Sequence, residues 1–174
     1  LCIKSKDVDE IVNTIQLISG SFGGINLEDI SAPRCFEVEQ KLKELCDIPV
    51  FHDDQHGTAI VVAAAFINAL KIVKKDMNTI KVVINGAGSA GIAIGKHLLN
   101  LGVKNLTMVD RFGIICEGMK DLNSAQAAIA KVTNPSHQHG SLADAMKDAD
   151  AFIGVSAPGV VTPDMIKSMA PHGI

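Results

Sequence analysis

The chain has 174 residues, of which 47% are hydrophobic and 20% are charged, and its formal net charge at pH 7 is −3. This composition is ordinary for a soluble α/β protein of one domain, or of one domain with part of another. A weakly acidic chain gives no reason to expect a nucleic acid or an anionic membrane as partner. The longest apolar run, 58–70, is shorter than the ~20 residues of a membrane helix, and we interpret it as a buried helix.

The first elements expected along the chain are a helix and a short strand. Apolar residues recur at helical spacing over 8–19. Asp7 is placed to cap this helix, and Glu10, three residues later, to complete a capping box. Glycines end the helix, and a strand is expected over 25–27.

A second helix, a strand and a long helix follow. Pro33 opens the second helix. The apolar run 48–51 predicts a strand that delivers an acidic cluster at its C-terminal end, and 58–74 predicts the long helix. A domain boundary is expected at this cluster, near 51–57.

From residue 79 onward the pattern alternates between strand and helix. The strands expected are 80–84, 106–109 and 151–155, and the helices are 91–101, 124–131, 142–147 and 163–169. Apart from Lys81, the strand 80–84 is apolar and β-branched, which is typical of a strand covered on both faces, and 151–155 is expected to be another buried strand. Such alternation predicts an α/β fold with a Rossmann-like, doubly wound parallel sheet.

A glycine-rich turn follows the first of these strands. Gly86, Gly88 and Gly91 have the Gly-x-Gly-x-x-Gly spacing between a strand and a helix, the context in which this motif binds a dinucleotide. Asp110 ends the next strand, where an acid normally bonds the adenine ribose. Asp110 would repel a 2′-phosphate, which slightly favours NAD; Arg111 beside it could neutralise that phosphate, so NADP stays open.

Two acidic pairs lie upstream of this turn, Glu28-Asp29 and Asp53-Asp54. Each pair comes at the end of a predicted strand, and carboxylates of this kind suit a hard divalent cation. The alternative for either pair alone is a turn or a helix cap, with Asp53-Asp54 capping the helix that starts near Thr58.

These motifs together resemble the bacterial type of malic enzyme. The resemblance is carried by Phe22–Ile30 and Phe51–Ala59, continues through Gly86–Gly91 and Phe152–Gly159 in the family's order, and runs the length of the chain. It implies oxidative decarboxylation of malate to pyruvate and CO2 with reduction of NAD or NADP. It also implies that 1–56 is the C-terminal part of a smaller metal- and substrate-binding α/β domain, and that 57–174 is a Rossmann domain truncated at its C-terminus.

The resemblance further assigns roles to residues. Glu28, Asp29 and Asp54 would be the ligands of Mg²⁺ or Mn²⁺, with Asp53 as a supporting carboxylate in the catalytic site. The cofactor-binding set would be Gly86, Ala87, Gly88, Ser89, Ala90, Gly91, Asp110, Ser156, Ala157 and Pro158. Of these, Ser156, Ala157 and Pro158 follow a sheet strand and would lie near the nicotinamide end.

The chain departs from the family in its acid–base residues. Malic enzymes use a tyrosine and a lysine upstream of the first acidic motif, but this chain has no Tyr, and Lys4 and Lys6 lie too close to the first helix to match. Neither Arg34 nor Arg111 is placed to grip the malate carboxylate. We therefore expect a piece of a longer polypeptide that is inactive alone and whose parent is a cytoplasmic homo-oligomer, a dimer in this family.

Two other functions stay open. A malolactic relative with tightly held NAD would release lactate rather than pyruvate. A non-catalytic dinucleotide-binding module would keep the fold without the chemistry, although four placed carboxylates have no purpose in such a module.

The remaining chemistry-bearing side chains are expected to be structural. The cysteines, Cys2, Cys35, Cys46 and Cys116, form no Cys-x-x-Cys pair and no zinc-like spacing, so we interpret them as reduced thiols. His52 and His56 flank the second acidic pair, and local hydrogen bonding is favoured over metal ligation for both.

Overall fold

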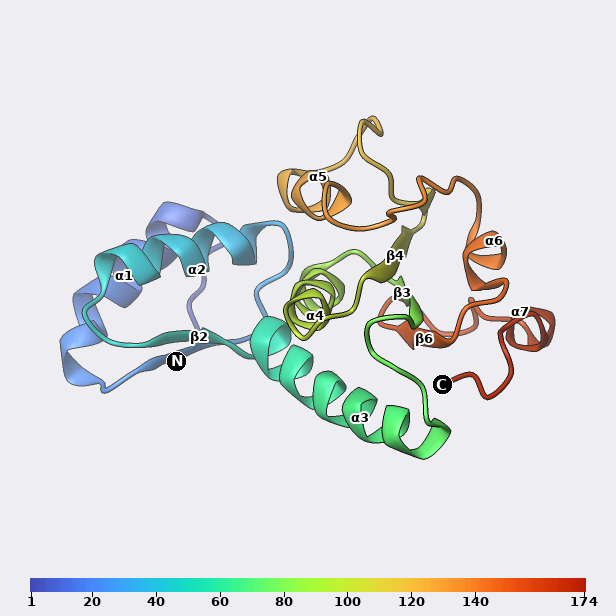
Figure 1. The fold of residues 1–174 in the computed structure, drawn as a ribbon. Coiled ribbons are helices and arrows are strands. Elements are labelled where there is room, and N and C mark those ends of the chain that lie inside the picture. Colours follow the sequence, from blue (N-terminus) through green and yellow to red (C-terminus); the bar gives the residue numbers. More distant parts are fainter.

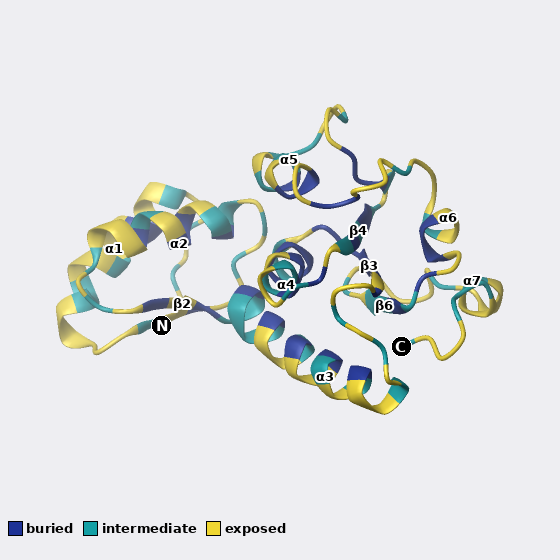
Figure 2. Ribbon diagram, in the orientation of Figure 1, coloured by how far each residue is buried: buried dark blue, intermediate teal, exposed yellow.

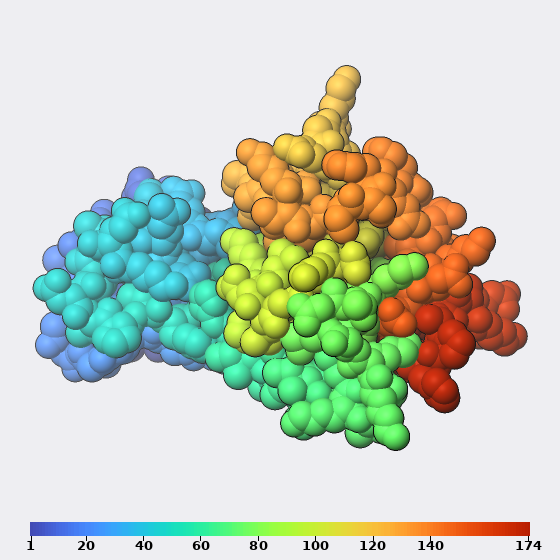
Figure 3. All heavy atoms as spheres, viewed as in Figure 1, coloured from blue at the N-terminus to red at the C-terminus, as the bar shows by residue number.

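The computed structural model describes residues 1–174 and has a small and a large lobe, side by side (Figures 1 and 3). The small lobe contains α1 (Val8–Ile18), the 3-10 turn Ser19–Ser21, β1 (Ile25–Leu27), α2 (Arg34–Leu45) and β2 (Val50–His52). A π-helical turn, Asp53–Gly57, leads into α3 (Thr58–Val73). The large lobe contains β3 (Lys81–Asn85), α4 (Ser89–Asn100), β4 (Asn105–Asp110), β5 (Gly113–Ile114), α5 (Ser124–Ala130), α6 (Leu142–Met146), β6 (Ala151–Gly154) and α7 (Pro163–Lys167).

Helix α1 begins at the predicted cap, but the predicted capping box with Glu10 does not form. Oδ1 of Asp7 accepts a 2.9 Å hydrogen bond from the N–H of Glu10. The carboxylate of Glu10 accepts from Ser5 Oγ rather than from Asp7 N–H, which itself donates to Ser5 Oγ at 3.0 Å. In a capping box the carboxylate of Glu10 would accept directly from Asp7 N–H. Here the Ser5 hydroxyl lies between these two groups and bonds to both.

The small lobe has its own core, and its two strands are parallel. The core residues are Ile11, Val12, Leu27, Val38, Leu42 and Val50. Strands β1 and β2 pair with Leu27 opposite His52. Parallel strands end at the same edge, so the residues that follow β1 and those that follow β2 emerge together.

The large lobe is built on a four-stranded sheet with the order β5-β4-β3-β6. Strand β3 pairs in parallel with both β4 and β6, which confirms the predicted α/β, Rossmann-like sheet. Strand β5 was not predicted; it pairs antiparallel with β4 and makes the sheet mixed. With only two residues, it is too short to produce an alternating pattern.

Helices cover both faces of this sheet, as a doubly wound fold requires. Val82 and Ile84 belong to the main core with residues of α3, α4 and α5, while Val83 belongs to a second core with residues of α6. The prediction that β3 is covered on both faces is therefore confirmed. The prediction of a buried strand at 151–155 holds only for Ala151, because β6 is the outer strand of the sheet and the rest of it is half-buried or exposed (Figure 2).

Helix α3 is buried on one face only, which corrects the prediction of a buried helix. Ala59, Ala63, Phe66 and Leu70 form the buried face, whereas Ile60, Val61 and Ile72 are exposed (Figure 2). Together with the π-helical turn it forms a 21-residue helix, Asp53–Val73, long and apolar enough to cross a membrane by those two criteria. A core helix meets the same criteria, and the buried face packs in the main core beside α4.

The three later helices each begin at a side-chain cap. Asn123 caps α5 in a reciprocal capping box with Gln126, and Ser141 caps α6 in the same way with Asp144. Thr162 caps α7, with Pro163 in the first turn. Such caps satisfy N–H groups that the helix leaves free, so these short helices start at defined residues.

Candidate functional site

The glycine turn joins β3 to α4 as predicted. Gly86 has φ 115°, and a Cβ on it would lie 2.6 Å from the carbonyl oxygen of Val155. A Cβ on Gly91 would lie 1.7 Å from the carbonyl oxygen of Gly86. Gly88 differs, because a Cβ there would have nothing within 4 Å. The fold itself requires glycine at Gly86 and Gly91. At Gly88 the backbone is open, which leaves room for a ligand to approach it.

The N-terminus of α4 is free to meet an anion. Its N-cap is Gly88, so no side chain bonds the first N–H groups of the helix, and Ser89, Ala90 and Gly91 form its first turn. Uncapped N–H groups and the helix dipole give this end a partial positive charge. A phosphate is the group that such an end binds best.

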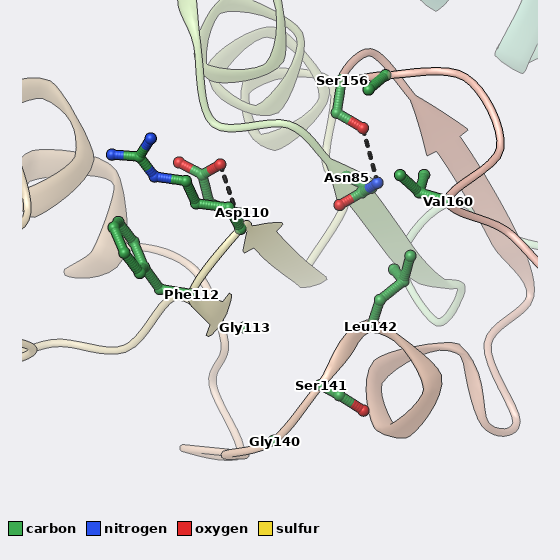
Figure 4. A pocket seen from close by; sticks show the side chains of 11 residues that line it. Asn85, Asp110, Phe112, Gly113, Gly140, Ser141, Leu142, Ser156 and Val160 are labelled. Carbon is green, nitrogen blue, oxygen red and sulfur yellow. Dashed lines mark hydrogen bonds between the residues drawn. The ribbon is translucent and has the colours of Figure 1, made fainter.

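A cavity of about 590 Å³ opens beside this turn, at the C-terminal edge of the sheet (Figure 4). It is lined by Asn85, Asp110, Arg111, Phe112, Gly113, Gly140, Ser141, Leu142, Ser156, Ala157 and Val160. Asn85 ends β3, Asp110 ends β4, and Ser156 follows β6. Because the chain passes from β3 to β4 on one side and β6 pairs on the other, the cavity lies at the switch point where open α/β sheets bind ligands.

The structure brings some of the predicted cofactor residues to this cavity and leaves others beside it. Asp110, Ser156 and Ala157 line it, whereas Gly86–Gly91 form the adjoining turn and Pro158 is exposed outside the wall. The buried amide of Asn85 donates a 2.8 Å hydrogen bond to Ser156 Oγ (Figure 4). This bond joins the ends of β3 and β6 across the floor of the site.

The carboxylate of Asp110 is held from two sides. Its Oδ1 accepts from the N–H of Arg111 at 2.8 Å (Figure 4), and its Oδ2 accepts from Nε2 of Gln126 at 2.7 Å. The guanidinium of Arg111 lies over the ring of Phe112, 4.6 Å from its centroid. The negative and the positive group expected at a ribose site are thus both at the cavity, which leaves the choice between NAD and NADP open.

The two acidic motifs meet at the edge where β1 and β2 end. The N–H of Asp29, a residue with φ 58°, donates a 3.0 Å hydrogen bond to Oδ2 of Asp54. Glu28 and Asp29 are exposed, and Asp54 is half-buried. No group of three His, Cys, Asp or Glu side chains is gathered as a ready metal site. The hard-oxygen donors thus fit a divalent cation in their chemistry, but Glu28, Asp29 and Asp54 are not drawn together as one ligand set.

The helix-cap alternative for the second acidic pair finds no support. Neither the π-helical turn nor α3 has a side-chain hydrogen bond at its N-cap. The carboxylate of Asp53 instead lies over Gly57, with Oδ1 2.4 Å from the place where a Cβ of residue 57 would be. Asp53 therefore packs on the turn that carries Asp54.

Glu39 of α2 fastens this turn to the small lobe. Its side chain is buried and accepts hydrogen bonds from Lys43 Nζ at 2.6 Å and Gln55 Nε2 at 3.1 Å, and it pairs with His56 Nε2. Burial alone would raise the pKa of Glu39, but Lys43 and His56 outweigh it and hold the pKa below its ordinary value. The prediction of local hydrogen bonding is confirmed for His56.

His52 departs from that prediction. It is fully buried, and neither ring nitrogen has a hydrogen-bond partner. Burial lowers its pKa, since a desolvated imidazolium is unfavourable. His52 is therefore a packed, neutral side chain at the end of β2.

Comparison with known families decides the origin of these motifs. A family model described as "Malic enzyme, NAD binding domain" matches residues 55–173, and one described as "Malic enzyme, N-terminal domain" matches residues 4–43. The chain belongs to the malic enzyme family. The resemblance inferred from the acidic and glycine motifs is thereby confirmed.

Individual malic enzymes match along nearly the whole chain. The NAD-dependent malic enzyme of Geobacillus stearothermophilus is 54% identical over 98% of this chain and 36% of its own length. The bifunctional malic/malolactic enzyme of Bacillus subtilis is 52% identical over 98% of this chain and 42% of its own. The crystal structure of NAD-dependent malic enzyme from Thermotoga maritima superposes with a TM-score of 0.95 at 49% identity, covering 98% of this chain and 46% of that one.

The chain thus spans less than half the length of the malic enzymes it matches. Other matching relatives are named NADP-dependent malic enzymes. A nicotinamide dinucleotide is therefore the cofactor class of the family, with both forms represented among relatives of this chain.

Several residues of the site were not predicted. Asn85 was not assigned a role although it is a polar residue ending an apolar strand, a signal that could have found it. Phe112, Leu142 and Val160 line the cavity, but nothing in their spacing marks them. Gln126 contacts Asp110 from 16 positions away, and the sequence pattern placed it only within the predicted helix 124–131.

Proposed function

We propose that the full-length protein containing this chain converts malate to pyruvate and CO2 with reduction of NAD or NADP. The observation that carries the proposal is the glycine turn beside a cavity at the sheet's switch point, in a chain of the malic enzyme family. The two acidic motifs joined by the Asp29–Asp54 hydrogen bond add carboxylate oxygens suited to a divalent cation, which a small hydroxy acid could chelate.

The division of labour follows the two lobes. We propose that 1–56 belongs to a metal- and substrate-binding domain and that 57–174 is the dinucleotide-binding domain. Separate cores in the two lobes support this. The acidic motifs would then face the cofactor domain from the end of β1 and from the turn that opens α3.

In the dinucleotide domain, the turn Gly86–Gly91 would hold the pyrophosphate at the N-terminus of α4. Gly88 lets the backbone approach it, and Ser89 and Ala90 offer N–H groups of the first helical turn. Asp110 would accept hydrogen bonds from the adenine ribose hydroxyls. Ser156, Ala157 and Pro158 would lie toward the nicotinamide, with Asn85 fixing Ser156.

Glu28, Asp29 and Asp54 would hold Mg²⁺ or Mn²⁺. Such an ion, when bound, lowers the pKa of the malate hydroxyl and polarises the ketone that forms. Asp53 would support this set from the π-helical turn. The hydrogen bond from Asp29 N–H holds the Asp54 carboxylate at the backbone of the first acidic motif before any ligand arrives.

Acid and base would come from the rest of the full-length protein. The chain contains no Tyr, and the pKa of the one fully buried imidazole, His52, is lowered. His52 is fully buried and neither ring nitrogen has a hydrogen-bond partner, so it has no hydrogen-bonded route for a proton. This chain's own residues bind and orient; they do not complete the proton transfers.

A malolactic activity is the second candidate, because the Bacillus subtilis relative is named a bifunctional malic/malolactic enzyme. The two activities differ in product. The full-length protein, given malate and NAD or NADP with Mn²⁺, should accumulate pyruvate if the first proposal holds. Lactate without net NADH would establish the second, and no consumption of malate would overturn both.

Self-association is proposed as well. Ile60, Val61 and Ile72 on α3 leave an apolar face uncovered by this chain, which either the rest of the full-length protein or a second subunit would bury. Light scattering of the full-length protein should give at least twice the monomer mass, and a monomer would refute this part.

A further inference from the structure

The side-chain amide of Gln126 is fixed at both ends. Its Oε1 accepts from the N–H of Asn123 at 3.1 Å, which closes the capping box of α5. Its Nε2 donates to Oδ2 of Asp110 at 2.7 Å and to the carbonyl oxygen of Ala87 at 3.3 Å. The acceptor end is thus fixed by a backbone donor, so the NH2 end must face the carboxylate.

Gln126 does this from behind the cavity. It is 9% exposed and does not line the cavity, whereas Asp110 does. Its two acceptors belong to different parts of the dinucleotide site: Ala87 to the glycine turn, and Asp110 to the end of β4. One buried amide therefore joins the pyrophosphate turn to the ribose carboxylate.

We propose that Gln126 is a positioning residue that favours the binding of NAD relative to NADP by holding the Asp110 carboxylate toward the adenine ribose. The inference rests on the proposed dinucleotide function of the cavity. Gln126 touches no ligand in this account; it acts through Asp110.

The number of free acceptor positions on the Asp110 carboxylate supports this role. Each oxygen of an ionised carboxylate has two acceptor positions. On Asp110 one position of Oδ1 is used by the N–H of Arg111 and one of Oδ2 by Gln126. One position on each oxygen stays open, which matches the two hydroxyls of a ribose diol.

The same hydrogen bond disfavours a 2′-phosphate on the ribose. A carboxylate held in place by an amide donor repels a phosphate at the ribose 2′ position. Released from Gln126, the Asp110 side chain can rotate away, and Arg111 is then the charged group left at this end of the cavity. Loss of the hydrogen bond from Gln126 to Asp110 should thus weaken NAD binding and leave NADP binding unchanged or stronger.

The test uses binding of NAD and NADP to the full-length protein by calorimetry. Gln126→Met removes the donor with little change in side-chain length. Loss of a hydrogen bond to a charged group should raise the Kd for NAD about tenfold, with the Kd for NADP unchanged or lower. Gln126→Glu keeps an acceptor for Asn123 N–H but has no donor, and NAD binding should weaken there too.

The control is Asn123→Ala, which removes the cap acceptor of α5 and touches neither Asp110 nor Ala87. It should lower the melting temperature yet leave the NAD/NADP ratio within about twofold. A double-mutant cycle completes the test: in an Asp110→Ala background, Gln126→Met should no longer change the ratio.

A ratio unchanged by Gln126→Met in a protein that is folded by circular dichroism would overturn the inference, as would an equal shift in the Asp110→Ala background. Failure of the wild-type protein to bind either dinucleotide would instead refute the proposed function of the cavity. The two failures are therefore distinguishable.

Discussion

The backbone N–H of Asp29 donates a 3.0 Å hydrogen bond to Oδ2 of Asp54, 25 residues further along the chain. The bond forms because β1 and β2 are parallel and end at the same edge. Asp29 adopts φ 58° where the chain leaves β1, and its N–H meets the second motif there. The two acidic motifs therefore form one structural unit.

If this unit binds a divalent cation, Asp54→Asn should weaken Mn²⁺ binding at least about tenfold, because a charged oxygen ligand is lost. The Asn oxygen can still accept from Asp29 N–H, so the fold should persist. Calorimetric titration of the full-length protein with Mn²⁺ measures the effect, and NAD affinity should not change.

The matched control is Asp164→Asn, which removes one carboxylate from the exposed start of α7. Its Mn²⁺ affinity should equal that of the wild type. If Asp54→Asn bound Mn²⁺ as tightly as the wild type, the acidic motifs would have only a structural role.

The glycine turn offers a pair of variants that separate folding from binding. Gly88→Ala places a methyl group in open space on extended backbone, so the free energy of unfolding should stay within about 0.5 kcal/mol. The Kd for NAD should rise about tenfold or more, because the methyl group keeps the pyrophosphate from the backbone.

Gly91→Ala should show the opposite pattern. Its methyl group would meet the carbonyl of Gly86 at 1.7 Å, so the protein should lose about 3 kcal/mol of stability or more. Urea unfolding and NAD titration of both variants decide the matter; normal NAD affinity in Gly88→Ala would place the dinucleotide elsewhere.

The sequence predicted those features that depend on local pattern. The apolar run of β3, the glycine turn and Asp110 at the end of β4 all follow from short-range spacing, and the structure places them as expected. The parallel order of the sheet followed from the alternation of strands and helices.

Features that depend on contacts between side chains far apart in the chain could not be predicted from the sequence. Gln126 reaches Asp110 and Glu39 reaches Gln55 only because separate elements pack together. The buried, unbonded His52 and the exposed face of α3 also depend on which surfaces meet. Periodicity marks an apolar face but not what covers it.

Glu39 should anchor the turn that carries the second acidic motif. Glu39→Ala leaves the buried amide of Gln55 without its acceptor and frees Lys43 and His56. Removing one member of such a buried network should cost about 2–3 kcal/mol. Amide exchange over 53–57 should accelerate accordingly.

Glu37→Ala is the control on the same helix, since Glu37 makes only an exposed pair with Lys41. Its cost should be below about 1 kcal/mol, with no change of exchange at 53–57. Similar behaviour of the two variants would show that Glu39 does not hold the turn.

Asp150 should give the protein an acid-sensitive contact. Burial opposes its ionisation, but hydrogen bonds from Lys75 Nζ and Lys81 N–H outweigh burial and hold its pKa below the ordinary 3.8. A lowered folded-state pKa stabilises the protein fully above the unfolded-state value, and the contribution disappears as pH falls through the folded-state pKa.

Melting temperatures of the wild type and Asp150→Asn, measured from pH 7 to pH 2, test this. The melting temperature of the wild type should exceed that of Asp150→Asn by most near neutral pH, and this difference should shrink below about pH 4. A constant difference over the whole range would mean that the Asp150 charge contributes nothing.

The most direct test of the central claim is the stoichiometry of the reaction in the full-length protein. With malate, Mn²⁺ and NAD or NADP, the proposed function predicts one NAD(P)H and one CO2 for each pyruvate, with activity abolished by a metal chelator and restored by added Mn²⁺. Malate oxidation without CO2, or turnover that a chelator leaves unchanged, would contradict it.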